Sequence, residues 1–578
     1  MKTKIGDGIG DVPAERHGPD GDCPYFPCHY PGQDCTLCYC PFYPCRDERF
    51  GEWIESKKLG KAWSCLHCVL PHKAGAVDDV ISLRDEMGER DLFDLIAERH
   101  GPKGKAVMVL GATSDAGKSV VCAALCRMLS RRGWAVIPYK SQNMSLNSRV
   151  LRGGREVSMI QELQSRAAGV RTPPHQINPI LMKPLGDSTS AVYVNGEPVG
   201  TYGVTEYYGD FVPNEGRAAL AESLSFLKSR YDFIVMEGAG SPAEINIYDV
   251  DLANMGAANE ADADCILVVN AEWGGSFAYA AGTVALIPEK DRRRIRGVVI
   301  NNVRGSTRGL VEGGKILEKI TGVPFLGAIP HIELDLPKED SECFRGAKRF
   351  GRGKTTVAVV RYPRISNFTD FDPLPFEDVT VVLADAADEI SVADAVILPG
   401  SKNPASDLEW MVGRGIDRAL RGMVGKVPIL GIGGGYAMLG KNFGAHGGLG
   451  IVDVAFDTDN PRPSAKVSAK YGELPVEGYS VSPSAEPHGG NGLFSLKGGA
   501  WEGYHDPDWM VMGTEINGIF DLPGFRDAFL RMIEGFDSPT TGVNHGDRVE
   551  ASLDALADAV EGSLDLDILN GIFGGSVF

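Results

Sequence analysis

The 578-residue sequence contains no apolar run of about 20 residues, the length that a membrane-spanning helix needs. Its first residues, MKTKIGDGIGDVPAERHG, lack the apolar core of a secretion signal. Basic residues are also few, because the chain has 58 Lys and Arg against 77 Asp and Glu, which gives a net charge of −19. These absences argue against a membrane protein, a secreted protein and a protein that binds nucleic acid nonspecifically. They predict a cytoplasmic protein.

Cysteine is scarce outside one short stretch. Eight of the twelve cysteines lie between Cys23 and Cys68, and none follows Cys343. Cys122 and Cys126 stand four residues apart in an expected helix, which is typical of core packing. In a reducing cytosol, clustered cysteines indicate metal ligands more often than disulfides.

The clustered cysteines have the spacing of metal ligands. Two C-x2-C pairs occur, and three histidines lie nearby, at His29, His67 and His72. Short spacing allows two soft thiolates to reach one ion, and eight cysteines are enough for two four-ligand sites. We expect zinc or an iron–sulfur cluster as a structural staple, with free or disulfide-bonded cysteines as the alternative. The candidate ligands are Cys23, Cys28, Cys35, Cys38, Cys40, Cys45, Cys65 and Cys68.

Changes in composition divide the chain into segments. Apolar strand-like runs alternate with helical stretches in two long segments, which predicts an α/β fold with doubly wound parallel sheets. The expected units are a cysteine-rich domain over 1–75, a helical connector over 76–102, an α/β domain over 103–345, a basic linker over 346–355 and a second α/β domain with closing helices over 356–578.

A phosphate-binding loop opens the first α/β segment. The stretch AVMVLGATSDAGKS combines a buried strand, a glycine-bounded turn and the start of a helix. Backbone N–H groups of such a turn surround an anion, the lysine reaches the outer phosphates, and the serine hydroxyl binds Mg²⁺. The alternative is a plain glycine turn between strand and helix. The candidate nucleotide and Mg²⁺ residues are Gly111, Thr113, Gly117, Lys118, Ser119 and, from a later strand, Glu237.

Three longer motifs follow this loop: PYKSQNMSLNS over 138–148, MEGAGSPAEINIYDVDLANMG over 236–256 and INNVRG over 300–305. With them the chain resembles the cobyric acid synthase family, the ATP- and glutamine-dependent amidases of cobalamin synthesis. Dethiobiotin synthetase, of the same wider fold class, shares the nine-residue phosphate loop. The resemblance runs from about residue 105 to the C-terminus. It implies a dethiobiotin synthetase-like P-loop domain followed by a class I glutamine amidotransferase-like domain.

The N-terminal stretch CPYFPCHYPGQDCTLCYCPFYPC resembles a small archaeal cysteine-rich domain found beside corrinoid-pathway enzymes. That resemblance implies a metal-binding domain and names no function for it.

The family resemblance implies roles for further polar residues. Amidation activates a carboxylate as an acyl phosphate, so the site must position the γ-phosphoryl group and neutralise its charge. Lys118, Glu237, Asp249 and Asp251 are the expected catalytic residues, the last two orienting ammonia or the acyl phosphate. Any single one of these polar residues has a solvated loop position as its alternative. The expected substrate contacts are Gln142, Asn143, Lys183, Glu244, Asn246 and Arg304.

One departure falls in this first half. Where the family pattern reads Asp-Ile-Asp-Arg-Gly-Gly, the chain has Asn-Ala-Glu-Trp-Gly-Gly over 270–275. Trp273 cannot pair with a phosphate or carboxylate as an arginine does, although it can stack on a planar ring. The substrate, or the position amidated on it, is therefore open.

The second half resembles the family's glutaminase domain without its reactive groups. AVILPGSKNPASDLEWM over 395–411 and VPILGIGGGYAMLG over 427–440 carry this resemblance. The family's nucleophilic cysteine falls on Gly433 and its catalytic histidine on Asn517. Neither residue can attack an amide or act as the base. We expect this domain not to hydrolyse glutamine.

The resulting expectation is an ATP- and Mg²⁺-dependent amide ligase acting on a corrinoid or related tetrapyrrole carboxylate. Its nitrogen would come from free ammonia or from a partner that supplies ammonia, and no nucleic-acid or membrane partner is expected. The alternative is a non-amidating binding or carrier protein of tetrapyrrole metabolism that ATP switches. A third reading makes the cysteine cluster an electron-transfer centre for corrinoid reduction.

Overall fold

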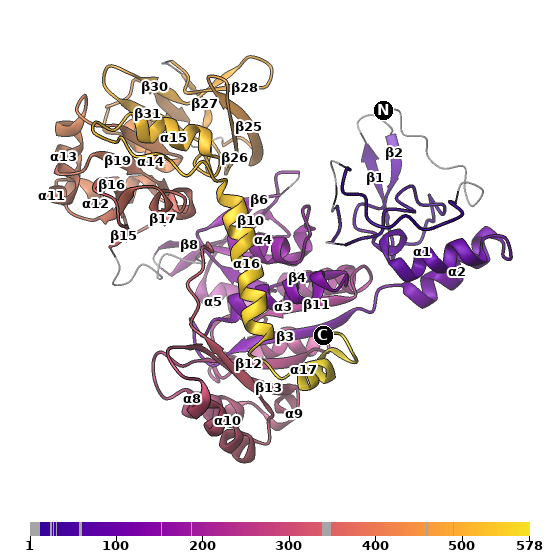
Figure 1. The fold of residues 1–578 in the computed structure, drawn as a ribbon. Coiled ribbons are helices and arrows are strands. Elements are labelled where there is room, and N and C mark those ends of the chain that lie inside the picture. Colours follow the sequence, from indigo (N-terminus) through magenta and orange to yellow (C-terminus); the bar gives the residue numbers. More distant parts are fainter. Residues whose placement is uncertain are drawn as a thin grey trace.

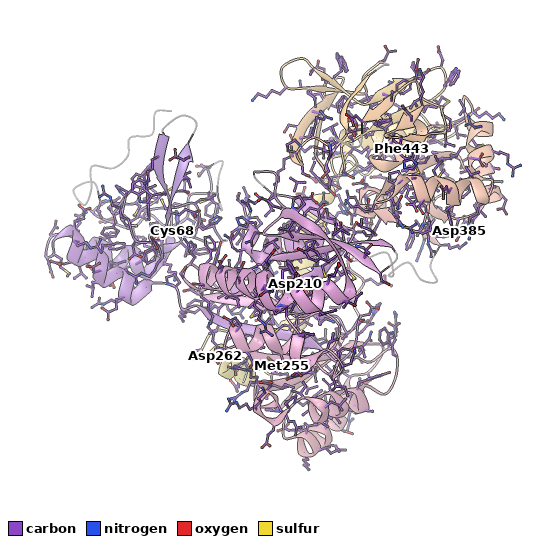
Figure 2. The ribbon with its side chains drawn as sticks, turned by 180° about the vertical axis from the view of Figure 1, so that it is seen from behind. Cys68, Asp210, Met255, Asp262, Asp385 and Phe443 are labelled. Carbon is purple, nitrogen blue, oxygen red and sulfur yellow. The ribbon has the colours of Figure 1, made fainter. Side chains whose placement is uncertain are left out.

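The computed structural model consists of three lobes (Figure 1). It describes residues 12–23, 26, 28–30, 32–56, 60–151, 153–186, 188–337, 348–457, 461–488 and 491–578. Cys343 and the expected domain boundary at 345–346 lie outside these residues. Figure 2 shows Cys68 in the N-terminal lobe, Met255 in the middle lobe and Phe443 in the third.

The N-terminal lobe is mostly irregular backbone closed by two helices. Strands β1 (Glu52–Ser56) and β2 (Gly60–Ser64) form an antiparallel hairpin. Helices α1 (Ala74–Leu83) and α2 (Glu89–His100) bury their apolar faces against the cysteine-rich loops. The helices predicted over 76–102 are present, but they pack into the cysteine-rich domain, because they supply more than half of the buried residues in its small core. That core includes Leu37, Phe42, Phe50, Val77, Val80, Leu92, Phe93 and Ile96.

The middle lobe, here called the first α/β domain, is built on a six-stranded sheet in the order β14-β13-β12-β3-β11-β4. Every neighbouring pair in this sheet is parallel, which confirms the predicted doubly wound fold. Its strands are β3 (Lys105–Gly111), β4 (Val136–Tyr139), β11 (Phe233–Glu237), β12 (Asp264–Asn270), β13 (Ile295–Val303) and β14 (Phe325–Pro330). Its helices include α3 (Lys118–Arg131), α4 (Met159–Ala167), α6 (Arg217–Lys228), α7 (Met255–Glu260), α8 (Ser276–Leu286), α9 (Glu289–Arg292) and α10 (Arg308–Thr321).

A second, smaller sheet extends the first α/β domain toward the third lobe. Its order is β10-β9-β8-β5, and a hairpin of β6 with β7 lies beside it. These strands are β5 (Gln142–Met144), β6 (Ser148–Val150), β7 (Glu156–Ser158), β8 (Ile180–Gly186), β9 (Thr189–Val194) and β10 (Glu197–Gly203). The chain after β10 forms the short α5 (Val204–Glu206) and a wide helical segment over Tyr207–Gly216.

The third lobe, here called the second α/β domain, contains a seven-stranded sheet in the order β15-β18-β16-β19-β21-β31-β30. Its five central strands are parallel and both edges are antiparallel. The strands are β15 (Arg349–Gly351), β16 (Thr355–Val360), β18 (Val379–Ala384), β19 (Ala395–Leu398), β21 (Ile429–Ile432), β30 (Tyr504–Asp506) and β31 (Val511–Thr514). The helices are α11 (Ala387–Ser391), α12 (Pro404–Gly413), α13 (Ile416–Met423), α14 (Gly434–Leu439) and α15 (Pro523–Arg531). A short pair, β17 (Ile365–Ser366) with β20 (Gly400–Ser401), and two small four-stranded sheets complete it.

The last two helices leave the second α/β domain and return to the first. Helix α16 (His545–Glu561) runs along the middle lobe (Figure 1), and Leu553 and Val560 are buried in that lobe's core together with α17 (Leu566–Phe573). Arg131 of α3 also forms ion pairs with acidic side chains of α16. The expected domain over 356–578 therefore needs correction, because its closing helices bury their apolar faces in the other domain.

Within the described part of the chain, none of the helices has both the length and the apolar character that crossing a bilayer requires.

Candidate active site

The nine-residue loop after β3 is held in place by the ends of two neighbouring strands. Asn270 at the end of β12 donates to Asp115 O at 3.0 Å, and Asn301 of β13 donates to Ala116 O at 3.2 Å. Gly117 closes the loop with φ 93°. A Cβ atom at Gly117 would lie 1.9 Å from Asn301 Nδ2, so only glycine fits between the loop and β13.

Lys118 begins α3 and directs its ammonium group back over the loop. Its side chain is 8% exposed, and Nζ donates to Thr113 O at 3.2 Å and to Gly240 O at 3.1 Å. The ammonium group thus joins the phosphate loop to the segment that follows β11. The loop concentrates positive charge at the N-terminus of a 14-residue helix, which suits a polyphosphate.

Glu237 lies at the carboxyl end of β11, beside the loop, and is 1% exposed. Its Oε1 accepts hydrogen bonds from Ser119 Oγ and from Lys140 Nζ, each at 2.8 Å. Gln164 of α4 donates to the other carboxylate oxygen. A carboxylate and a hydroxyl at one point are the hard oxygen donors that Mg²⁺ prefers, so the residues present fit this ion.

Lys140 and Gln164 were not assigned from the sequence. Lys140 directly follows strand β4 and belongs to the PYKSQNMSLNS motif, so its position at the carboxyl edge of the sheet was a usable signal. No comparable signal marked Gln164, which reaches Glu237 from the helix α4.

The predicted substrate residues Gln142 and Asn143 stand on β5, just after Lys140. Gln142 Oε1 accepts a hydrogen bond from Tyr207 OH at 2.7 Å. Asn143 is 3% exposed, and its Nδ2 has no hydrogen-bond partner among the residues that the structure describes.

The acidic turn after β11 separates into two parts. Glu244, Asn246 and Asp249 are exposed at its surface. Asp251 accepts hydrogen bonds from the backbone N–H groups of Ala253 at 2.9 Å and of Gly256 at 3.2 Å, so it caps α7. Burial raises the pKa of Asp251, although these backbone donors oppose the rise. In this structure Asp251 serves a helix start, and it does not join Lys118 and Glu237.

The two predicted anion contacts are both paired with carboxylates. Arg304 is exposed and lies 3.1 Å from Glu272, which also accepts from Asn302 Nδ2 at 2.8 Å. Lys183 is only 1% exposed and pairs with Glu156. Lys183 therefore lies in a buried contact and does not face an open site.

That contact is a buried ion network between the two α/β domains. Glu156 accepts from Ser148 Oγ at 2.8 Å and, across the interface, from Ser464 Oγ at 3.1 Å. Burial by itself raises the pKa of Glu156, but the charges of Lys183 and Lys402 lower it to about 2. Lys402 and Ser464 belong to the second α/β domain, so one carboxylate holds side chains of both domains.

The second α/β domain contains a polar cavity of about 230 Å³ at the same topological position as the phosphate loop. Gly433 directly follows strand β21 and has φ 52° and ψ −115°, and α14 begins at the next residue. Asn517 lies on the opposite wall, where its Oδ1 accepts from Asn367 Nδ2 at 3.1 Å. Other lining residues are Ser401, Lys402, Ser482, Ser484 and Glu515.

Comparison with known proteins is consistent along the chain. Residues 15–91 match a "Cysteine-rich small domain", 107–341 a "CobQ/CobB/MinD/ParA nucleotide binding domain" and 356–524 a "CobB/CobQ-like glutamine amidotransferase domain". A "Probable cobyric acid synthase" of Methanothermobacter thermautotrophicus is 42% identical over 507 residues, which cover 82% of this chain and 99% of that protein. The chain belongs to the cobyric acid synthase family.

Two further relatives come from other organisms and match the chain over a similar length. A "Probable cobyric acid synthase" of Methanosarcina mazei is 38% identical and covers 81% of this chain and 99% of its own length. The "Cobyric acid synthase" of Trichormus variabilis is 39% identical, with 80% and 99% covered.

Trp273, which the sequence predicts to depart from the family pattern, stands on the loop after β12. It is 53% exposed. Glu272 beside it binds Asn302 and Arg304, so the loop itself is tied to the end of β13. The indole is therefore presented to solvent at the ligand-binding edge of the sheet.

The cysteine-rich domain of this family member carries a second set of chemical groups. No disulfide links the cysteines among the described residues. Cys40, Cys45 and Cys68 line a small apolar cavity beneath α1 and α2. Burial, followed by the nearby Cys65 and Cys45 thiols, raises the pKa of Cys40 to about 12. Among the described residues, however, these three sulfur atoms do not form a group close enough together to hold a metal ion.

Proposed function

We propose that this protein is an ATP-dependent amide ligase that converts carboxylates of a corrinoid, or of a related tetrapyrrole, into carboxamides. The observation that carries the proposal is the complete constellation of Lys118, Ser119 and Glu237 around one phosphate loop. Its relatives named cobyric acid synthase support the class of substrate. A protein that only held a tetrapyrrole would not need this constellation.

The reaction balances without any redox partner. A substrate carboxylate oxygen attacks the γ-phosphorus of ATP, and ADP leaves. Ammonia then attacks the acyl carbon, phosphate leaves, and the nitrogen loses a proton to give the amide. Lys118 neutralises charge on the transferred phosphoryl group. Bound Mg²⁺ would supply further charge neutralisation, with Ser119 and Glu237 as its protein ligands.

Lys140 has a positioning role in this proposal. Its ammonium group lies 2.8 Å from Glu237 Oε1 and holds the carboxylate in place beside Ser119. Gln142 and Asn143 follow it on the same segment and bind substrate polar groups. The exposed polar residues Glu244, Asn246 and Asp249 remain candidates for the late, ammonia-dependent step.

Ammonia is supplied from solution or by a partner protein in this proposal. Three glycines of the GIGGG run are required by packing: a Cβ would lie 2.7 Å from Tyr436 Cα at Gly431, 2.7 Å from Ser401 N at Gly434 and 2.0 Å from Leu398 O at Gly435. At Gly433 the nearest atom to a Cβ would be 4.0 Å away. The turn has room for a side chain at that position, and none is present.

On the cavity wall opposite Gly433, Asn517 also lacks a group that could help to hydrolyse glutamine. Asn517 contacts Asn367 and donates to Tyr479 O at 3.3 Å, and an amide offers no basic nitrogen. The domain then keeps a docking role, because Glu156 and its partners hold it against the first α/β domain.

The experiment is an incubation of the full-length protein with ATP, Mg²⁺ and cobyrinic acid derivatives, with ammonium chloride or glutamine as the nitrogen source. ADP release and the mass change of one hydroxyl-to-amino replacement per carboxylate are measured. We expect amide formation with ammonium and none with glutamine. No substrate-stimulated ADP release with any tetrapyrrole acid would reject the ligase and favour the ATP-switched carrier.

A matched variant tests the nitrogen source. Gly433→Cys combined with Asn517→His restores a thiol and a base on the existing walls, and Gly433→Ala with Asn517→His serves as its control. Glutamine-dependent turnover in the first variant alone would support the proposal that the unmodified protein cannot use glutamine because it lacks a thiol and a base at these two positions. Efficient glutamine use by the unmodified protein would contradict the proposal.

A further inference from the structure

Two histidines of the N-terminal lobe lie in a cluster that the spacing of the cysteines did not predict. Cys28 Sγ and one ring nitrogen each of His29 and His72 all lie within 4.8 Å of one another. The two imidazole rings are 4.7 Å apart between centroids. This is the one group of three such ligand atoms that the described residues bring together. His72 is 42 positions further along the chain than Tyr30, yet Tyr30 OH donates to its carbonyl oxygen at 2.6 Å.

The hydrogen bonds of His72 orient its ring as a metal ligand's ring is oriented. Its Nδ1 lies 2.7 Å from Asp34 O, and a carbonyl oxygen can only accept, so Nδ1 carries the proton. Nε2 is then left with its lone pair available. A backbone carbonyl that accepts from one ring nitrogen is the usual outer partner of a histidine whose other nitrogen binds a metal. The side chain is 4% exposed, so this orientation is fixed by packing.

Gln33 holds the other two members. It is 1% exposed, and its Oε1 accepts from the backbone N–H of His29 at 2.8 Å. Its Nε2 lies 3.1 Å from Cys28 Sγ. One buried amide thus fixes the Cys28–His29 turn and offers an N–H to the sulfur, an interaction that a thiolate accepts better than a thiol.

We propose that Cys28, His29 and His72 form a mixed thiolate–imidazole site for a divalent cation of the zinc class, with its fourth coordination position open. One soft and two borderline donors suit zinc. Cys28 and His29 also line a cavity of about 570 Å³, whose other wall includes Val170, Arg171 and Tyr231 of the first α/β domain. The open position faces this cavity and takes water or a small ligand that donates a lone pair.

The mixed site differs from the surroundings of the other cysteines. Cys40, Cys45 and Cys68 pack against the apolar core of the lobe and line an apolar cavity, and no group of three ligand atoms forms among them in the described residues. A site with three protein ligands beside a cavity is instead the arrangement of zinc that binds exchangeable ligands. The inference rests on the proposed metal-binding role of this domain and extends it to a second kind of centre.

The first test measures the metal content of the full-length protein and of single variants after dialysis. His72→Ala and His29→Ala are each expected to lose one equivalent of zinc. His67→Ala is the matched control, because His67 lines the same cavity but is not in the cluster. It is expected to keep the full content. His72→Cys replaces one ligand by another and should restore the equivalent, which separates ligand loss from misfolding.

The second test uses cobalt in place of zinc. Cys28→Ser should lower the intensity of the thiolate-to-cobalt absorption by the share of one site, and added imidazole, the probe for the open position, should shift the visible cobalt spectrum. Full metal content in both histidine variants, with loss in Cys23→Ser and Cys38→Ser, would overturn the proposal in favour of an all-cysteine site. A spectrum that imidazole leaves unchanged, with loss of a cobalt equivalent in Cys35→Ser, would overturn the open position. Amidation activity enters neither readout, so failure here is distinct from failure of the ligase.

Discussion

The two α/β domains use the same turn in different ways. In the first, β3 leads through Gly117, at φ 93°, into α3; in the second, β21 leads through Gly433, at φ 52°, into α14. Both turns present a helix N-terminus at the carboxyl edge of a parallel sheet, where such folds bind ligands. The first turn is followed by a lysine and a serine and faces a buried carboxylate. The second is followed by two glycines and faces a cavity lined by serine and asparagine side chains.

In both domains the backbone forms a turn that can bind a ligand, and the side chains on and around that turn decide which reaction it can support. Close contacts require the glycines around Gly433, whatever side chain stands at position 433 itself. The second domain also remains useful to the first, because its C-terminal helices complete the first domain's core.

The largest effect is expected from Lys118→Ala, which tests whether the turn after β3 is the reaction centre. Removing the ammonium group from the first turn should lower ADP release by at least about 1000-fold, because preorganised charge at the transferred group is lost. Lys105→Ala is the matched control at the other end of β3, where Lys105 pairs with Asp264 at 2.8 Å. If turnover survives Lys118→Ala, the phosphate loop is not the reaction centre.

The dependence of the two domains on each other is tested by Glu156→Gln. It leaves Lys183 buried without its carboxylate, so we expect a loss of about 3–5 kcal/mol in the free energy of unfolding. Because folding lowers the pKa of Glu156 from 4.5 to about 2, its stabilisation is complete above pH 4.5 and disappears as the pH falls toward 2. Denaturant unfolding, followed by fluorescence, should therefore show the difference between wild type and variant shrinking over that window. A difference that is constant with pH would contradict the ion network.

Glu237→Gln tests whether Glu237 binds Mg²⁺ beside the first turn. We expect a loss of about 100-fold in turnover, partly recovered at high Mg²⁺ concentration, since Ser119 remains. Lys140→Met in the same background removes the buried ammonium group that contacts the Glu237 carboxylate in the unmodified protein. Activity with unaltered dependence on Mg²⁺ would mean that Glu237 only holds Lys140.

The smallest effect is expected for the ion pairs of helix α16, which follows the second α/β domain in the chain and packs against the first. Arg131→Ala removes ion pairs with Asp554 and Asp558 on α16 and should cost at most about 1 kcal/mol, because these charges are well solvated. Leu553→Ala, in the buried face of the same helix, should cost about 2–5 kcal/mol. Equal losses in thermal unfolding would mean that charge, rather than apolar burial, attaches α16.

Short motifs were enough to predict which residues meet at the phosphate loop. Lys118 and Ser119 stand next to each other in a strand–turn–helix, and Glu237 ends another buried strand, so parallel pairing of the two strands was enough to bring them together. Asp251 shows the limit of the same reasoning. It belongs to a polar motif, yet its carboxylate caps the following helix, and only hydrogen-bond directions distinguish the two roles.

Local order along the chain was enough for the phosphate loop, the parallel sheets and the cysteine-rich segment, because strand–turn–helix units and ligand spacings depend on neighbouring residues. Packing alone decided that α16 belongs with α3, that Lys183 lies against Glu156 and that His72 joins Cys28 and His29. These contacts join residues tens to hundreds of positions apart. They form because buried charges need partners and apolar helix faces need cover, and several placements in the sequence could have met each need.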